Sequence, residues 1–499
     1  MSTVIVSGDP ITPQQVVEVA YRRADVAVSD DLAQRLAPAR RVVDDALDSN
    51  EVIYGITTGF GALASTHIGR SQGEALQYNL LRSHSTGLGD PLPDELVRAM
   101  LLLRARTLAQ GHSGVRPVIV EKLVEMLQKD ILPVVPSQGS VGASGDLAPF
   151  AHLALPLIGE GRVRVNNITM ASADSGLEPI ELQTKEGLSL LNGTEGMTAM
   201  GALALGRARL LVEAADVAAA LTVEAVLGSA TPFRSEIHAL RPHPGQTASA
   251  HHIASLLQGS EIGESHKDDF DHAVQDAYSL RCAPQVHGAV ADTLDFLESV
   301  LTREMASVVD NPIVFPETGE VLSGGNFHGQ PLAFSFDYAT IAVSELASIS
   351  ERRTDRVLDP VRSQGLPAFL ALEPGVNSGY MVCQYVQAAL VAENKVLSHP
   401  ASIESIPTSG SQEDHVSMGW GAGKKLLEVL ENVRRVIAIE LMCSTQGIEY
   451  RAPLQPAPGT ARAASTIREV VPPLVEDRAP AEDIETIADL ISEGAFNVG

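Results

Sequence analysis

The sequence predicts an all-α protein in which a loop-rich N-terminal region precedes an elongated bundle of long, nearly antiparallel helices. Only 4% of the 499 residues are aromatic, whereas Ala and Leu recur throughout, and this balance favours helices over strands. Hydrophobic residues make up 44% of the chain, which is sufficient for a sizeable core. The texture changes near residue 200, so we expect a first region over residues 1–200 and a helical region over 201–499, with a soft boundary between them.

Glycine-rich turns punctuate the first region. They occur at 54–61 ("YGITTGFG"), at 85–95 ("STGLGDPLPDE") and at 139–152 ("GSVGASGDLAPFAH"). The last of these becomes apolar directly after Asp146, where we expect a helix to begin. Because such turns alternate with short elements, the first region is expected to be rich in loops.

Long amphipathic segments follow residue 200, at 285–309, 333–358, 379–397 and 416–446. In the last segment, apolar residues recur at spacings of four, three, four and four, which is one stripe of an α-helix. They are Leu426, Leu430, Val433, Ile437 and Leu441. Helices of this length with Ala-rich faces predict a bundle. Since such bundles often continue across subunit interfaces, we expect a homo-oligomer.

The charge balance argues against a nucleic-acid partner. The chain has 62 acidic and 36 basic residues and a formal net charge of −26. Nucleic-acid-binding proteins show the reverse balance. The acidity is most simply explained by solubility.

No segment is expected to enter a membrane. The N-terminal "MSTVIVSGDPITPQQ" has no basic stretch followed by an apolar one. The most apolar long run, 210–228, is interrupted by Glu213, Asp216 and Glu224.

The cysteines point to a reducing compartment. Cys282, Cys383 and Cys443 lie far apart and in no CxxC spacing, which argues against a disulfide framework and a cysteine-based metal site. His251-His252 and the other histidines show no zinc pattern. We therefore expect a cytoplasmic protein without a metal.

The stretch "GSVGASGDLAPFAH" has three explanations. A phosphate cradle is disfavoured, because the chain has no GxxxxGK[ST] motif and no GxGxxG between a clear strand and a helix. A glycine-rich turn that caps the next helix is the plain structural explanation. The third is chemical: with no bulk at Ala143 and Gly145, the Gly145 nitrogen can attack the Ala143 carbonyl carbon. After loss of the Ser144 hydroxyl, a five-membered ring with a methylidene group results, an electrophile that no side chain supplies.

This stretch resembles the signature of the aromatic amino acid ammonia-lyase and aminomutase family, in which Ala-Ser-Gly cyclises to 4-methylideneimidazole-5-one (MIO). Further blocks resemble other family blocks in the same order: "YGITTGFG", "LLNGTEG", "VQDAYSLRCAPQVHG", "DNP", "SGGNFHGQP" and "SQEDHVSMG". The resemblance spans nearly the whole chain. It implies an all-α ammonia-lyase (fumarase/aspartase-like) architecture, a homotetramer with active sites shared between subunits, and no exogenous cofactor.

The implied reaction is non-oxidative elimination of ammonia from an aromatic L-amino acid. Tyr54 matches the family tyrosine usually assigned as the base that takes the β-proton, and Tyr278 is a competing candidate. Because a free tyrosine has a pKa near 10, the site must lower the pKa of its base or work at raised pH, which predicts an alkaline optimum. Arg281 would share a helical face with Tyr278 and is the natural bidentate partner of the substrate carboxylate.

The resemblance also implies supporting residues. Asn192 and Gln275 offer amides for the MIO oxygen, the carboxylate and the amine. Phe327 would pack near the MIO ring, unless it is a plain core residue. Asp146 resembles the family aspartate linked to cyclisation, although a helix N-cap is the simpler role. Glu195 departs from the pattern, since many members carry an amide there.

The substrate is expected to depend on the residues that meet the aromatic ring. Ser83-His84 in "LLRSHSTGLG" resembles the histidine-selective members of the family, whereas phenylalanine-selective members look like Phe-Leu here. Glu413 in "SQEDHVSMG" points the same way, because a carboxylate suits an imidazole and is costly beside a bare phenyl ring. The resemblance therefore implies conversion of L-histidine to trans-urocanate.

Other functions stay open at this point. Within the family, an aromatic aminomutase would re-add the amine at the β-carbon, and a tyrosine or phenylalanine ammonia-lyase would take another substrate. Outside it, the chain could be a non-catalytic helical oligomer whose MIO site is unformed.

Overall fold

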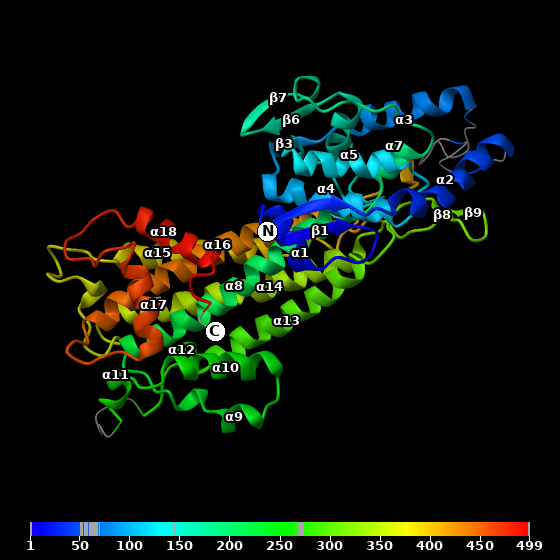
Figure 1. Cartoon of the computed structure of the whole chain (residues 1–499). Coiled ribbons are helices and arrows are strands. Elements are labelled where there is room, and N and C mark those ends of the chain that lie inside the picture. Colours follow the sequence, from blue (N-terminus) through cyan, green and yellow to red (C-terminus); the bar gives the residue numbers. More distant parts are fainter. Residues whose placement is uncertain are drawn as a thin grey trace. The chain divides into compact units, whose positions relative to one another are not determined.

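The structure, a computed structural model, describes residues 2–49, 53, 58, 68, 70–143, 145–267 and 274–497. It is mainly helical, as predicted (Figure 1). The chain forms two compact units. The first comprises Met1–Leu203, Glu298–Phe336 and Pro400–Lys424, and the second comprises Ala204–Leu297, Asp337–His399 and Lys425–Gly499.

The first unit combines short helices with small sheets. Its elements are β1 (Ser2–Val6), α1 (Pro13–Ala20), β2 (Ala24–Val28), α2 (Leu32–Ser49), α3 (Arg70–His84), β3 (Leu88–Pro91), α4 (Asp94–Ala109), α5 (Pro117–Gln128), β4 (Leu132–Pro133), β5 (Pro136–Gln138), α6 (Leu147–Ala154), β6 (Arg162–Val165), β7 (Ile168–Ala171), α7 (Glu186–Leu191), β8 (Ile313–Phe315) and β9 (Glu320–Leu322).

Strand pairing in this unit is local. β1 and β2 pair in parallel with Ser2 opposite Ala24, whereas β3–β5, β4–β6, β6–β7 and β8–β9 are antiparallel. Helix α1 begins with a capping box, in which Thr12 Oγ1 accepts the Gln15 N–H and the Gln15 side chain accepts the Thr12 N–H. The strands of this unit are thus short, and turns and helix caps determine where its elements begin and end.

The second unit is built from helices. They are α8 (Glu195–Ala225), α9 (Ser235–Ala239), α10 (Pro244–Leu256), α11 (Glu261–Glu264), α12 (Tyr278–Arg281), α13 (Ala283–Glu304), α14 (Gln330–Leu358), α15 (Met381–Leu397), α16 (Gly419–Glu449), α17 (Pro458–Arg468) and α18 (Ala481–Ser492). The long helices α8, α13, α14 and α16 contribute residues to both units.

The long helices confirm the periodicity analysis. The four predicted segments correspond to α13, α14, α15 and α16. Every residue of the predicted stripe on α16 is at most 2% exposed. Helix α13 ends at Glu304, earlier than predicted, because the β-branched Val308 and Val309 and the residues before Pro312 disfavour helix.

Two of the charges within the apolar run of α8, Asp216 and Glu224, are hydrogen-bonded in the core. Asp216 accepts hydrogen bonds from Ser249 Oγ at 2.6 Å and from His287 Nδ1 at 2.7 Å. Glu224 accepts one from the Ala457 N–H at 2.8 Å. Buried carboxylates need such partners.

In the part of the chain that the structure describes, α14 alone has the length and composition to cross a membrane, and its apolar window is 61% buried inside the protein, which is the pattern of a core helix.

Candidate active site

The glycine-rich turn before α6 depends on backbone conformations that glycine adopts most readily. Gly142 has φ +65° and Gly145 has φ +81°. The backbones of Gly145 and Gly193 form an isolated bridge, so a Cβ on Gly145 would lie 2.1 Å from the Gly193 carbonyl oxygen. Ala143 is buried, and Ser144 lies outside the described residues. The structure therefore leaves no room for side chains at Gly142 and Gly145, on either side of the proposed cyclisation.

Two blocks that are distant in sequence bond directly to this turn. From "NGTEG", the Gly193 carbonyl accepts the Asp146 N–H at 2.9 Å. From "SQEDHVSMG", Ser417 Oγ donates to the Gly142 carbonyl at 3.0 Å. A Cβ on Gly142 would lie 2.1 Å from that hydroxyl oxygen. Both blocks thus hold the turn from within the first unit.

Two further blocks lie against the same neighbourhood. The Gly87 N–H, from "STGLG", donates to His152 Nε2 on α6 at 3.1 Å. In "GGNFHG", a Cβ on Gly329 would lie 3.2 Å from Ser417 Oγ, and Phe327 is half-buried nearby in the chain. The structure therefore brings together four of the blocks that were singled out in the sequence.

Asp146 does not cap the helix that follows it. It occupies the N-cap position of α6, but its side chain makes no capping hydrogen bond there. Its carboxylate accepts hydrogen bonds from Ser140 Oγ and from the Met197 N–H in the first turn of α8, each at 2.9 Å. Burial raises the pKa of this carboxyl from 3.8 to about 7, against the opposing effect of both hydrogen bonds. Asp146 is therefore a buried acid that can exchange a proton near neutral pH.

We predict that Asp146→Asn makes folding stability less dependent on pH, while the amide keeps an oxygen for the Met197 N–H. Because the folded pKa of about 7 lies above the ordinary value of 3.8, the folded protein holds an extra proton between these values. Stability through this group therefore falls as the pH rises, on the order of 4 kcal/mol across that range. Urea unfolding of both proteins at several pH values measures the difference, and equal pH slopes would contradict the assignment.

Asn192 has one atom whose hydrogen-bonding capacity is unused. The residue is 3% exposed, and its Nδ2 donates to the Asn311 carbonyl at 2.9 Å. Its Oδ1 is buried and has no hydrogen-bond partner among the described residues. Buried polar atoms are rarely left unpaired. Since Asn192 directly precedes Gly193, its Oδ1 fits the predicted role of accepting a bond from a bound amine.

The charge of Glu413 acts on the His84 imidazole. His84 ends α3, and its Nδ1 lies 3.0 Å from the Leu80 carbonyl oxygen and 3.0 Å from Ser83 Oγ. Burial lowers the pKa of His84, and the charge of Glu413 opposes this effect. The Glu413 carboxylate also accepts a hydrogen bond from Thr408 Oγ1 at 2.7 Å. The structure thus places a carboxylate near the imidazole that was predicted to select the substrate.

The predicted residues of "VQDAYSLR" belong to the second unit. Tyr278 begins α12 and Arg281 ends it, and the Arg281 Cζ lies 4.6 Å from the Tyr278 ring centroid. This contact confirms that the two side chains share a face. Arg281 Nε also donates to the Asp276 carbonyl at 3.0 Å. Tyr278 is 71% exposed and Gln275 is exposed too, so both are accessible from outside the chain.

Comparison with known proteins shows the family of this chain. Residues 11–469 match the family described as aromatic amino acid lyase. The chain belongs to the aromatic amino acid lyase family. The predicted ammonia-lyase architecture is confirmed by solved structures of this family.

The lyase is similar to its relatives over its full length. It is 50% identical to the histidine ammonia-lyase of Anaeromyxobacter sp. (strain K), with 100% of each chain covered. The structure of histidine ammonia-lyase from Trypanosoma cruzi matches with a TM-score of 0.91 and 42% identity, covering 99% of this chain and 94% of that one. The tyrosine aminomutase from Streptomyces globisporus matches with a TM-score of 0.93 and 39% identity, covering 99% and 98%.

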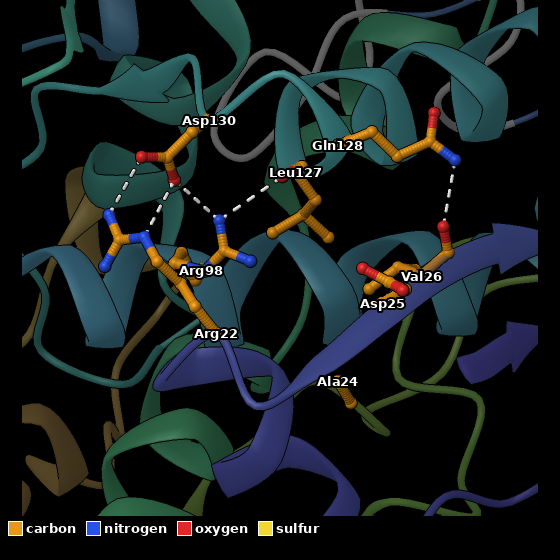
Figure 2. A pocket seen from close by; sticks show the side chains of 8 residues that line it. All are labelled: Arg22, Ala24, Asp25, Val26, Arg98, Leu127, Gln128 and Asp130. Carbon is orange, nitrogen blue, oxygen red and sulfur yellow. Dashed lines mark hydrogen bonds and ion pairs between the residues drawn. The ribbon is translucent and has the colours of Figure 1, made fainter. Parts of the chain in front are cut away.

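A pocket of about 400 Å³ lies beside β2 and the end of α5 in the lyase (Figure 2). Three of its charged groups pair with one another: Arg98 Nη1 and Arg22 Nη2 donate to the two oxygens of Asp130 at 2.7 and 3.0 Å. Gln128 Nε2 donates to the Val26 carbonyl at 2.9 Å. None of the predicted site residues lines this pocket. We therefore assign it no part in the lyase reaction.

Several polar residues around the turn were not predicted from the sequence. Arg104 of α4 is 0% exposed, and its signal was a charge inside the apolar run "LLLRARTLA". Ser140 and Ser417 had no comparable signal.

Tyr54 lies outside the described residues, so its role as base stays a prediction. Within the described ranges, no group of three His, Cys, Asp or Glu side chains is placed to hold a metal ion.

Proposed function

We propose that this lyase eliminates ammonia from L-histidine and releases trans-urocanate. The observation that carries the proposal is the interaction of His84 with Glu413. An imidazole substrate needs polar partners for its ring nitrogens, whereas a carboxylate facing a phenyl ring would be a costly buried charge. The relative from Anaeromyxobacter, identical at half of the aligned positions, is a histidine ammonia-lyase.

We propose that Ala143, Ser144 and Gly145 form MIO, the group that this family uses. One feature fits it: Gly145 has no room for a side chain against Gly193. The group supplies an electrophilic carbon to which the substrate amine adds, which makes the nitrogen a better leaving group. No cofactor from solution is then required.

Side chains of the protein carry out the remaining steps. Arg281 binds the substrate carboxylate, for which a planar guanidinium is a matched bidentate partner. His84 and Glu413 orient the imidazole. Tyr54 or Tyr278 takes the β-proton, the C–N bond breaks, a C=C bond forms and ammonia leaves, with no change in redox state.

The supporting residues complete the site. Asp146 directly follows the cyclising tripeptide, and its pKa of about 7 suits it to exchange protons during the two dehydrations. Asn192 and Gln275 offer amide groups to the bound substrate. Phe327, which is half-buried, packs near the ring.

We also propose that the lyase is a cytoplasmic homotetramer whose active sites draw on more than one copy of the chain. Exposed apolar side chains recur with helical spacing on α15, and such a stripe is costly in water. They are Val382, Tyr385, Val386 and Val396. The three unpaired cysteines fit a reducing compartment. Light scattering should give four times the mass of one chain, and a stable monomer with full activity would contradict shared sites.

The function is tested with purified lyase and L-histidine alone. Urocanate should appear, measured by its ultraviolet absorbance, together with one ammonia for each urocanate. L-tyrosine and L-phenylalanine should react at least about 10²-fold more slowly. A β-amino acid product would instead favour an aminomutase, the activity of the Streptomyces globisporus relative. No product from any of these substrates would contradict an enzymatic function.

A further inference from the structure

A buried arginine lies behind the glycine-rich turn, and the elimination reaction does not explain it. Arg104 is 0% exposed within the buried helix α4. A guanidinium at such a position is costly unless it is paired and hydrogen-bonded. The hydrogen-bond partners of Arg104 therefore indicate its role in the protein.

Arg104 bonds at three points to the segment that runs from Ser189 to Glu195, the first residue of α8. Its Nη1 donates to the carbonyls of Ser189 at 3.2 Å and Asn192 at 2.8 Å. Its Nη2 donates to Glu195 Oε2 at 2.8 Å, in an ion pair whose side chains are 0% and 4% exposed. The guanidinium thus fixes the chain on both sides of Gly193.

Gly193 is enclosed between this ion pair and the turn. A Cβ on Gly193 would lie 2.3 Å from Glu195 Oε2 and 2.9 Å from Arg104 Nη2. Its carbonyl oxygen, in turn, lies where a Cβ on Gly145 would be placed. Gly193 therefore cannot withdraw from Gly145 unless the ion pair moves.

The same guanidinium also contacts the helix that follows the turn. The Arg104 Cζ lies 4.3 Å from the ring centroid of Phe150 on α6, a cation–π contact. Arg104 therefore contacts α6, which follows Gly145 in the chain, and the 189–195 segment, whose Gly193 pairs with Gly145.

We propose that Arg104, paired with Glu195, positions the backbone for cyclisation of the tripeptide 143–145. This inference rests on the proposed MIO chemistry and adds a positioning residue for its formation. Arg104 touches no reacting atom. By keeping Gly193 pressed against Gly145, it maintains the compact backbone in which the attacking nitrogen and the carbonyl carbon can meet.

The reaction that this positioning serves is a double dehydration. The Gly145 nitrogen bonds to the Ala143 carbonyl carbon, whose oxygen leaves as water with the protons of the Gly145 and Ser144 nitrogens, and a C=N bond forms. Ser144 then loses its side-chain hydroxyl group and its Cα proton, which together leave as a second water, and a C=C bond forms. No oxidant or reductant is consumed.

Arg104→Lys tests the proposal, because lysine keeps the charge beside Glu195 but cannot hold the carboxylate and both carbonyls together. The readout is the intact mass of freshly purified protein and of samples taken during incubation. Wild-type protein should already lack two waters, about 36 Da, whereas the variant should lose them about tenfold more slowly or worse. Its circular dichroism should remain helical with cooperative unfolding. Complete water loss in the fresh variant would overturn the inference.

Arg353→Lys is the matched control, since Arg353 and Glu440 form an ion pair in the second unit with both side chains 0% exposed. It should lower the unfolding temperature but leave the water loss complete, and an equal delay in both variants would refute a specific role for Arg104. If Arg104→Lys does not fold, Glu195→Asp keeps both charges but withdraws the carboxylate by one methylene. It should show the delay, and its absence would overturn the inference. An unmodified wild-type mass would refute the proposed function instead.

Discussion

Ser144→Ala is expected to abolish ammonia release while leaving the fold intact. Alanine has no hydroxyl to eliminate, so the methylidene group cannot form and the substrate amine has no electrophile to attack. We expect kcat for L-histidine to fall by about 10⁴-fold or more. Steady-state kinetics, intact mass and circular dichroism on one preparation measure the three effects.

Ser137→Ala is the matched control for this variant. Ser137 lies on β5, directly before the glycine-rich turn, and its backbone carbonyl, which the substitution preserves, accepts the hydrogen bond of Trp420 Nε1 at 3.0 Å. The control should keep both the water loss and the turnover. Turnover near the wild-type level in Ser144→Ala would rule out the MIO mechanism.

Glu413→Gln is expected to reduce turnover of L-histidine far more than binding of an aromatic inhibitor that lacks an imidazole. The glutamine keeps the size of the side chain but removes the charge that acts on His84. Because that charge is proposed to face the substrate imidazole or the departing ammonium, kcat/KM should fall by about 10²-fold or more. The inhibition constant should change little.

The neighbouring carboxylate offers a control for Glu413. Asp414 is exposed, so Asp414→Asn removes the same charge one residue away and should leave both constants unchanged. Equal losses in turnover and inhibitor binding for Glu413→Gln would indicate a general disturbance of the loop. Unchanged kinetics would remove Glu413 from the site.

The features that could be predicted from the sequence are local ones. The spacing of Leu426, Leu430 and Val433 depends only on the helical repeat, and these residues are buried on α16 as expected. The contact of Tyr278 with Arg281 follows from a separation of three residues on one helix. The start of α6 at Leu147 follows from the end of the glycine-rich stretch.

The contacts that build the site could not be predicted in the same way, because they join segments far apart in the chain. An aspartate before an apolar helix usually caps that helix. Here the Asp146 carboxylate instead accepts a hydrogen bond from the Met197 N–H of α8. This partner is set by the packing of α8 against the turn. Likewise, nothing in the run "LLLRARTLA" reveals that Arg104 will meet the carbonyl of Asn192.

The intact mass of the purified wild-type protein, followed by addition of L-histidine to the same sample, tests the central claim most directly. We expect a mass lower than that of the unmodified sequence by two waters, about 36 Da, and the appearance of urocanate. A full mass with no urocanate would contradict both the backbone cyclisation and the proposed elimination.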